Sequence, residues 1–131
     1  MQTTKVKDSG MTFIDEWREF QLDAFNTAKD HGFHDGDSDE PNILNLQFEQ
    51  RLMLIVGEVA EAHDDHRHGC GIQDMSLDEM TGKPGGIPSE LADIVIRVAD
   101  LAETYGIDLA LAIGYKMMYN KDREFMHGRQ F

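Results

Sequence analysis

The sequence predicts an all-α fold with a four-helix core, and three observations lead to this prediction. Apolar residues recur at the three- and four-residue spacing of amphipathic helices in four separate segments. Glycines and short polar stretches separate these segments, as is typical of helix ends. No run of β-branched residues alternates with polar ones, so we expect no sheet. The 131 residues suit one domain, 1–131, that can bury a core.

The first two helices are expected over residues 12–30 and 42–69. Thr12 and Asp15 have the spacing of a capping box at the start of the first helix. The second segment is the longest, and its apolar residues form one continuous stripe along a helical face. We therefore expect the second helix to be the spine of the fold.

The third and fourth helices are expected in the C-terminal half of the chain. The third begins around Pro88 and Ser89, which are favourable first-turn residues, and stops at Gly106. The fourth opens at Asp108, a strong N-cap, and runs toward Gly128. These two segments complete the predicted set of four.

Two segments are expected to lie outside the helices. Residues 69–87 contain five glycines and Pro84, and a loop of this length is usually functional or disordered. Its position suits a lid over a site, and simple disorder is the alternative. Residues 1–11 are polar and are expected to form a flexible N-terminus.

The strong negative charge bears on possible partners. The formal net charge is -13, with 25 acidic residues against 12 basic ones, so a nucleic acid polymer is a poor partner. An acidic protein that handles phosphate usually needs a metal ion to reverse the local charge. The alternative explanation is that the acidity only keeps the domain soluble.

The expected location is the cytoplasm, without a membrane partner. No apolar run is long enough to span a bilayer, and Met1–Gly10 lacks the apolar stretch of a signal peptide. Cys70 is the only cysteine, so no internal disulfide forms, which agrees with a reducing compartment.

Two pairs of carboxylates lie at the borders of apolar helical stripes. Glu58 and Glu61 are three residues apart and share a face of the second helix. Glu90 and Asp93 repeat this arrangement on the third helix, and Arg97 has the spacing for an ion pair with Asp93. If the two helices pack antiparallel, the acidic stripes converge.

Four carboxylates gathered in a partly buried place repel one another and lose hydration, so they need a compensating charge. Mg²⁺ is the natural candidate because it is a hard ion that takes oxygen ligands, and Mn²⁺ is a plausible substitute. No set of cysteines and histidines has zinc spacing. The competing interpretation is that the glutamates mark a solvated helix edge.

Taken together, these motifs resemble the MazG-like branch of the all-α NTP pyrophosphatase superfamily. The resemblance covers most of the chain from about Trp17 onward. It implies the four-helix core of that superfamily, assembled through its helices into an oligomer. The matching stretches are Gly32-Phe33, Gly57–Glu61, Gly86–Arg97, Tyr105–Asp108, Lys116–Arg123, His127-Gly128 and Phe131.

The resemblance implies a nucleotide pyrophosphatase that hydrolyses an NTP or dNTP to the monophosphate and pyrophosphate. Such a hydrolase would act in nucleotide-pool control or in precursor supply. By the same resemblance, the metal-binding and catalytic residues are Glu58, Glu61, Glu90 and Asp93.

The resemblance also implies residues that contact the substrate. Lys116, Asn120 and Arg123 match substrate-contacting positions on the last helix, where the alternative is a solvated basic face. Trp17 and Phe33 are candidates for stacking on the base, although core packing is the alternative role for Trp17.

Two positions depart from the family pattern. Many relatives carry an acidic residue where this chain has Gly57, so a ligand or a supporting group is missing or replaced. Relatives often have an aromatic residue where this chain has His34. If that turn helps to form the base pocket, the base preference differs.

A homo-oligomer is expected, either a dimer or a tetramer made of two dimers, with part of the base pocket supplied by a second subunit. Two alternatives stay open. One is a non-catalytic helical oligomerisation or binding module, favoured by methionines such as Met117-Met118. The other is a pyrophosphohydrolase of a phosphoribosyl-ATP-like metabolite. His63-Asp64 invites comparison with HD-type phosphohydrolases, but a histidine-rich helix end explains it more simply.

Overall fold

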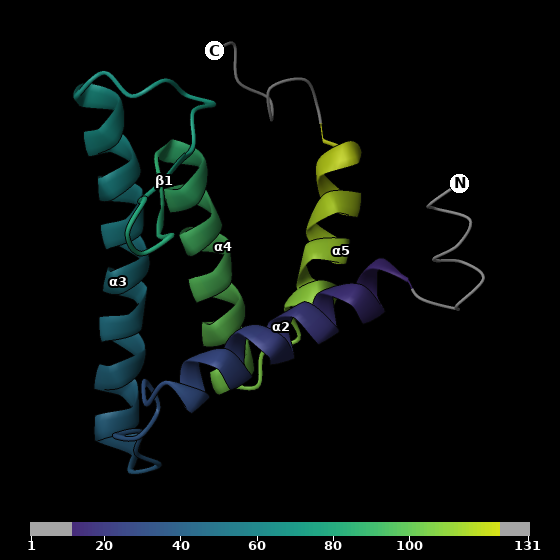
Figure 1. Cartoon of the computed structure of the whole chain (residues 1–131). Helices are drawn as coiled ribbons and strands as arrows, with labels where there is room; N and C mark the ends of the chain where they lie inside the picture. Colours follow the sequence, from purple (N-terminus) through teal and green to yellow (C-terminus); the bar gives the residue numbers. More distant parts are fainter. Residues whose placement is uncertain (1–11, 124–131) are drawn as a thin grey trace.

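The computed structural model describes residues 12–123 and confirms the all-α fold class (Figure 1). Residues 1–11 and the motif residues His127, Gly128 and Phe131 lie outside the described residues. Within the described range, no helix combines the length and the apolar character needed to cross a membrane. The elements are α2 (Phe13–Asp30), α3 (Pro41–Arg67), β1 (Ser76–Leu77), β2 (Pro84–Gly85), α4 (Ile87–Thr104) and α5 (Leu109–Lys121).

Helices α2, α3 and α5 begin where a side chain satisfies the first free N–H groups, whereas α4 begins after Gly86 without a side-chain cap. Thr12 Oγ1 accepts a hydrogen bond from Asp15 N at 3.2 Å, which confirms the predicted cap of α2. Asp108 caps α5 in the same way. Helix α3 begins one residue earlier than expected, at Pro41, because Glu40 supplies the cap.

The expectation that the last helix runs toward Gly128 was wrong, because α5 ends at Lys121. The N–H of Asp122 turns back to the carbonyls of Tyr119 and Asn120, which closes the last turn. An acidic residue at this end is unfavourable for the helix dipole, and this agrees with the early stop.

The expectation of no sheet was also wrong in one detail, because β1 and β2 form a small antiparallel hairpin. Strands of two residues are too short to produce a visible alternation in the sequence. Gly86 follows the hairpin with φ of 97°, and a Cβ there would lie 2.3 Å from the carbonyl oxygen of Asp74. Only glycine therefore fits where the loop meets the start of α4.

Helices α3 and α4 lie side by side and run in opposite directions, while α2 packs across α4 (Figure 1). Helix α5 packs chiefly against α2. Arg18 of α2 pairs with Asp108 at the start of α5. Buried Gln21 donates to Glu103 and to the carbonyl of Ile107, both at 3.1 Å. These bonds join α2 to the α4–α5 turn.

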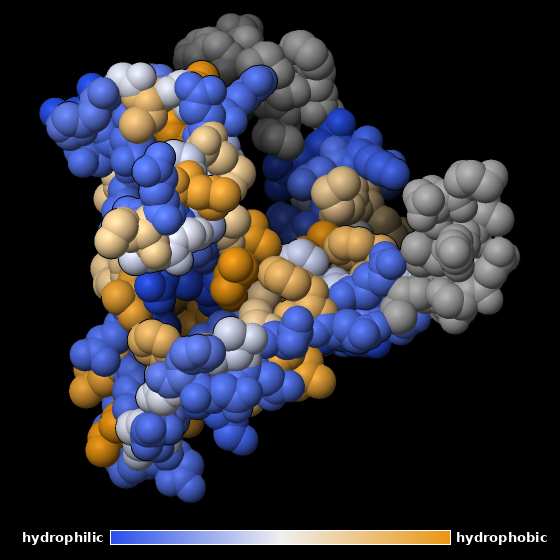
Figure 2. Space-filling model, in the orientation of Figure 1, coloured by the Kyte–Doolittle hydropathy of each residue, from blue (hydrophilic) through white to orange (hydrophobic). Residues whose placement is uncertain are grey.

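The core of one chain is small. Its buried apolar residues are mostly alanines, and no large side chain among residues 12–123 is fully buried. Many large apolar side chains are exposed instead, including Met53 and Val56 on α3 and Tyr115 and Met118 on α5. Figure 2 shows apolar atoms around the hollow between the α3–α4 pair and α5. The helices thus leave extensive apolar surface uncovered within one chain.

Candidate metal centre

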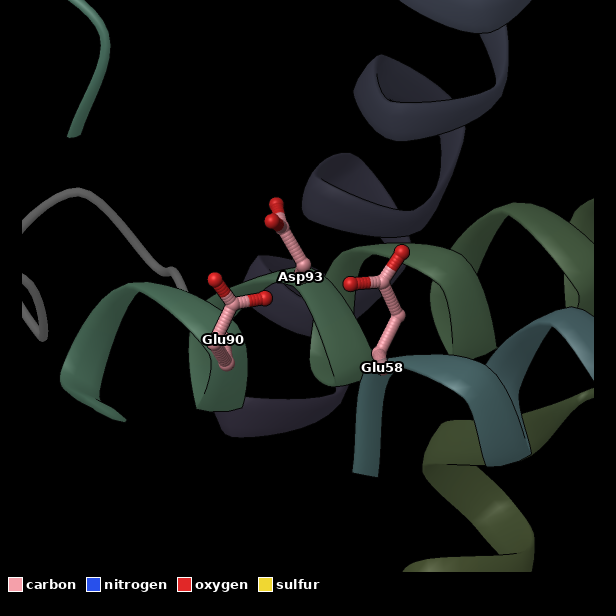
Figure 3. A group of neighbouring side chains, drawn as sticks. All are labelled: Glu58, Glu90 and Asp93. Atoms are coloured by element: carbon pink, nitrogen blue, oxygen red, sulfur yellow. The ribbon is translucent and has the colours of Figure 1, made fainter. Parts of the chain in front are cut away.

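Three of the predicted carboxylates converge between α3 and α4. Glu58 comes from α3, and Glu90 and Asp93 come from α4 (Figure 3). One oxygen of each lies within 4.8 Å of the others. This convergence follows from the antiparallel packing, which brings the acidic stripes of the two helices to the same level.

Glu61 lies beside this group. It is exposed and is not one of the three residues whose oxygens converge. It nevertheless lies close enough to interact with both Glu58 and Glu90, and it contributes to the pKa shifts of both. The structure therefore brings all four predicted carboxylates into one neighbourhood, with Glu61 at its edge.

Glu58 is the buried member, and Arg97 is its partner. Burial alone would raise the pKa of Glu58, but the hydrogen bond from Arg97 leads a set of interactions that hold it below its usual value. Arg97 Nε donates to Glu58 Oε1 at 2.6 Å. The expected pairing of Arg97 with Asp93 is replaced by this bond between helices, which sequence spacing within one helix does not predict.

Glu90 has the opposite shift. Its burial, followed by its hydrogen bond with Glu61 and repulsion from Glu61, Asp93 and Glu58, raises its pKa to about 7. Burial and the crowding of like charges thus leave Glu90 partly protonated near neutral pH. Even so, one guanidinium does not offset the charge of the other three carboxylates, so the cluster retains excess negative charge.

The donor set fits a hard divalent cation. Every ligand atom in the group is a carboxylate oxygen, and no histidine or cysteine of the described chain joins it. Mg²⁺ and Mn²⁺ favour such ligands, whereas zinc sites use sulfur or imidazole nitrogen more often. The raised pKa of Glu90 supports the same assignment, since a cation would relieve the repulsion that causes part of the shift.

A cleft of about 610 Å³ runs from the carboxylates along α4, with α2 and α3 as its other walls. Glu58 and Asp93 line it at one level of α4. Phe33, His34 and Asp100 line it further along. The cleft therefore joins the carboxylate cluster to a second group of residues that contains an aromatic ring, a histidine and a further carboxylate.

The two aromatic candidates lie in different places. Phe33 lines the cleft and is 75% exposed, so its ring is open to a ligand. Trp17 does not line the cleft, because it packs against Phe13 and Phe20 on α2. Its indole N–H donates to Gln21 at 3.2 Å. Trp17 thus lies neither at the cleft nor in the buried core, because it is only half-buried and both of its aromatic neighbours are exposed.

The three substrate contacts predicted for the last helix are not brought to the cleft of their own chain, and Arg123 lies beyond the end of α5 at Lys121. Neither Lys116 nor Asn120 nor Arg123 is among its lining residues. Lys116 and Arg123 instead approach the ring of Tyr119, with 5.6 Å and 4.7 Å to its centroid. Within one chain, these cations and the carboxylates are therefore separate.

Sequence reasoning missed Asp100 as a cleft residue and Arg97 as the partner of Glu58. A signal for both exists in the spacing, because Asp93, Arg97 and Asp100 follow one another at four and then three residues. This spacing places them along one face of α4, and all three line the cleft.

The chain was compared with protein-family models, with curated proteins and with solved structures, and none of them matches it.

Proposed function

We propose that this protein is a cytoplasmic, Mg²⁺-dependent hydrolase that cleaves an NTP or dNTP to the monophosphate and pyrophosphate. It would serve nucleotide-pool control or precursor supply. The convergence of Glu58, Glu90 and Asp93 is the observation that carries the proposal. The resemblance to MazG-like pyrophosphatases supports it, because the motifs of that resemblance contain these same residues.

Glu58, Glu90 and Asp93 would hold the metal, with Glu61 beside them. Mg²⁺ supplies neutralisation of phosphate charge and acidification of a water molecule, and Mn²⁺ is expected to substitute. The all-carboxylate donor set supports this choice of metal.

The chain's own groups suit the remaining tasks. In the metal-free protein Glu90 has a pKa of about 7, so binding of the cation near neutral pH would displace its proton and leave a charged ligand. Arg97 is half exposed at the carboxylate end of the cleft, and its other N–H groups are available to a phosphate oxygen. The cleft of about 610 Å³ has room for the rest of a nucleotide along α4.

The active form is proposed to be a homo-oligomer, a dimer or a dimer of dimers. Exposed apolar side chains such as Val56 and Tyr115 support this, because such surface is usually covered in a stable protein. The position of Lys116 and Asn120 outside the cleft gives a second argument. A second copy would bring these residues to the substrate.

Two other functions remain as competing proposals. The exposed apolar faces favour a non-catalytic helical binding module, which would release no pyrophosphate. A pyrophosphohydrolase of a phosphoribosyl-ATP-like metabolite would use the same carboxylates on a different substrate. Pyrophosphate release from a panel of NTPs, dNTPs and phosphoribosyl-ATP, with and without Mg²⁺, distinguishes all three.

A further inference from the structure

The far end of the cleft contains a histidine held between two carboxylates. The His34 side chain is only 6% exposed. Its Nδ1 lies 2.7 Å from Asp37 Oδ2, and its Nε2 lies 2.8 Å from Asp100 Oδ1. Arg51 also pairs with Asp37 and donates to Tyr105 at 2.8 Å. This network fixes the turn after α2 against α3 and α4.

The same network fixes the orientation of Asp100. Its Oδ1 faces His34, and Thr104 Oγ1 lies 3.4 Å from the same oxygen. Its Oδ2 accepts no hydrogen bond from any residue in the range 12–123. Asp100 lines the cleft and its side chain is 22% exposed, so this second oxygen is an acceptor without a partner in the described chain.

The surroundings of Asp100 suit a flat ring. The cleft that Asp100 lines has a mostly apolar surface, with Ala28, Ile96 and Leu101 among its lining residues, and Phe33 offers an exposed ring. Aromatic side chains stack on the faces of nucleobases. A carboxylate oxygen among apolar walls selects a ligand group that can donate a hydrogen bond.

The distance along α4 suits a nucleotide. Asp100 follows Asp93 by seven residues, which is two helical turns and a rise of roughly 10 Å. Both residues line the cleft. A ligand with its phosphates at the carboxylate cluster would therefore extend its base toward Asp100.

We propose that Asp100 accepts a hydrogen bond from the exocyclic amino group of the substrate's base. The enzyme then prefers nucleotides of cytosine or adenine to those of uracil or hypoxanthine. This inference rests on the proposed function. It adds the chemical class of the base, which the carboxylate cluster alone does not specify.

The hydrogen bonds already made by Asp100 narrow the choice of base. Guanine presents two neighbouring donors that suit both oxygens of a carboxylate, but Oδ1 of Asp100 already faces His34. Uracil presents its N–H between two carbonyl oxygens, which a carboxylate repels. The exocyclic amino group of cytosine or adenine projects beyond its neighbouring ring nitrogens, so it can reach the single remaining oxygen while those acceptors stay further away.

The test compares kcat/KM within matched pairs, CTP against UTP and ATP against ITP, in the presence of Mg²⁺. The amino member of each pair is expected to be favoured by about tenfold or more, the effect of one hydrogen bond to a charged group. In Asp100→Asn, the amide can turn its NH₂ group toward a keto oxygen while its oxygen still faces His34, so the preference should fall or reverse. Asp39→Asn, at an exposed position, is the matched control.

The results of these kcat/KM comparisons either support or overturn the role of Asp100 in base recognition. Equal values within the wild-type pairs, or a preference for the keto members, would overturn the role of Asp100 while leaving the pyrophosphohydrolase proposal intact. An unchanged preference in Asp100→Asn would also overturn it. Silence with every nucleotide would overturn the proposed function and this inference with it. The wild-type comparison is independent of whether the variant folds.

Discussion

Arg97 Nε lies 2.6 Å from Glu58 Oε1, and within residues 12–123 it is the cation that pairs with the carboxylate cluster. The bond joins α4 to α3 at the level where a metal ion is proposed to bind. Arg97 thus offsets part of the negative charge that a cation would otherwise neutralise. The guanidinium and the metal are expected to compete for Glu58.

Arg97→Gln should therefore lower the stability of the metal-free protein but increase its stabilisation by Mg²⁺. Without metal, the variant should lose about 1 kcal/mol of stability, because this half-exposed ion pair is gone. The increase in Tm caused by Mg²⁺ should become larger, since no guanidinium competes for Glu58. Thermal unfolding with EDTA and with Mg²⁺ measures both effects, with exposed Arg67→Gln as the control. An equal or smaller Mg²⁺ response would contradict the competition.

Glu58→Gln and Asp93→Asn should each abolish turnover while leaving the helical fold intact. Each variant removes a charged oxygen from the proposed metal site, so the rate of pyrophosphate release should fall by more than about 100-fold. Circular dichroism checks the fold. Glu49→Gln changes an exposed glutamate on the same helix as Glu58 and should retain activity. Full activity in either site variant would rule out the metal assignment.

Metal binding should strengthen as pH rises through about 7, because the proton on Glu90 competes with the cation. The metal-free protein should behave in the opposite way. Folding raises the pKa of Glu90 from its ordinary value of 4.5 to about 7, so its protonated form stabilises the metal-free protein fully below about pH 4.5. This contribution to stability is lost as pH rises through about 7. Tm measured from about pH 6 to about pH 8, with and without Mg²⁺, records both trends.

Glu90→Gln provides the control for this pH dependence. The glutamine does not titrate, so both the loss of metal-free stability and the gain in metal response should flatten. A wild-type Mg²⁺ response that stays constant over this range would show that Glu90 does not compete with the metal.

Self-association should depend on the apolar face of α3. Val56 is 54% exposed, and a charge there would be costly to bury between two copies of the chain. Val56→Glu should therefore shift the protein toward monomer in sedimentation velocity. Asn45→Glu adds the same charge at an exposed polar position on the same helix and should leave the assembly unchanged. A wild-type protein that sediments as a monomer would contradict the proposed oligomer.

The helices could be predicted because their signals are local. Thr12 and Asp108 lie where caps are needed, and both act as caps in the structure. The β1–β2 hairpin could not be predicted, since strands of two residues leave no periodic pattern. Spacing alone placed Glu58 with Glu61 and Glu90 with Asp93. Their convergence also required α3 and α4 to pack antiparallel.

The contacts between helices could not be predicted from the spacing of residues within one helix. Arg97 has the spacing to pair with Asp93 on its own helix, yet it pairs with Glu58 because α3 lies within reach. The same limit applies to Phe33 and Trp17, because both are aromatic and the sequence does not show which of them lies at the cleft. Only Phe33 lines the cleft, because the turn after α2 directs it there while Trp17 packs along α2.

Release of pyrophosphate from the common NTPs and dNTPs, measured with and without Mg²⁺, tests the central claim most directly. We expect Mg²⁺-dependent release of pyrophosphate and the matching monophosphate from at least one nucleotide, and none from Glu58→Gln. Absence of release from every nucleotide, or equal release with EDTA in place of Mg²⁺, would contradict a metal-dependent pyrophosphohydrolase.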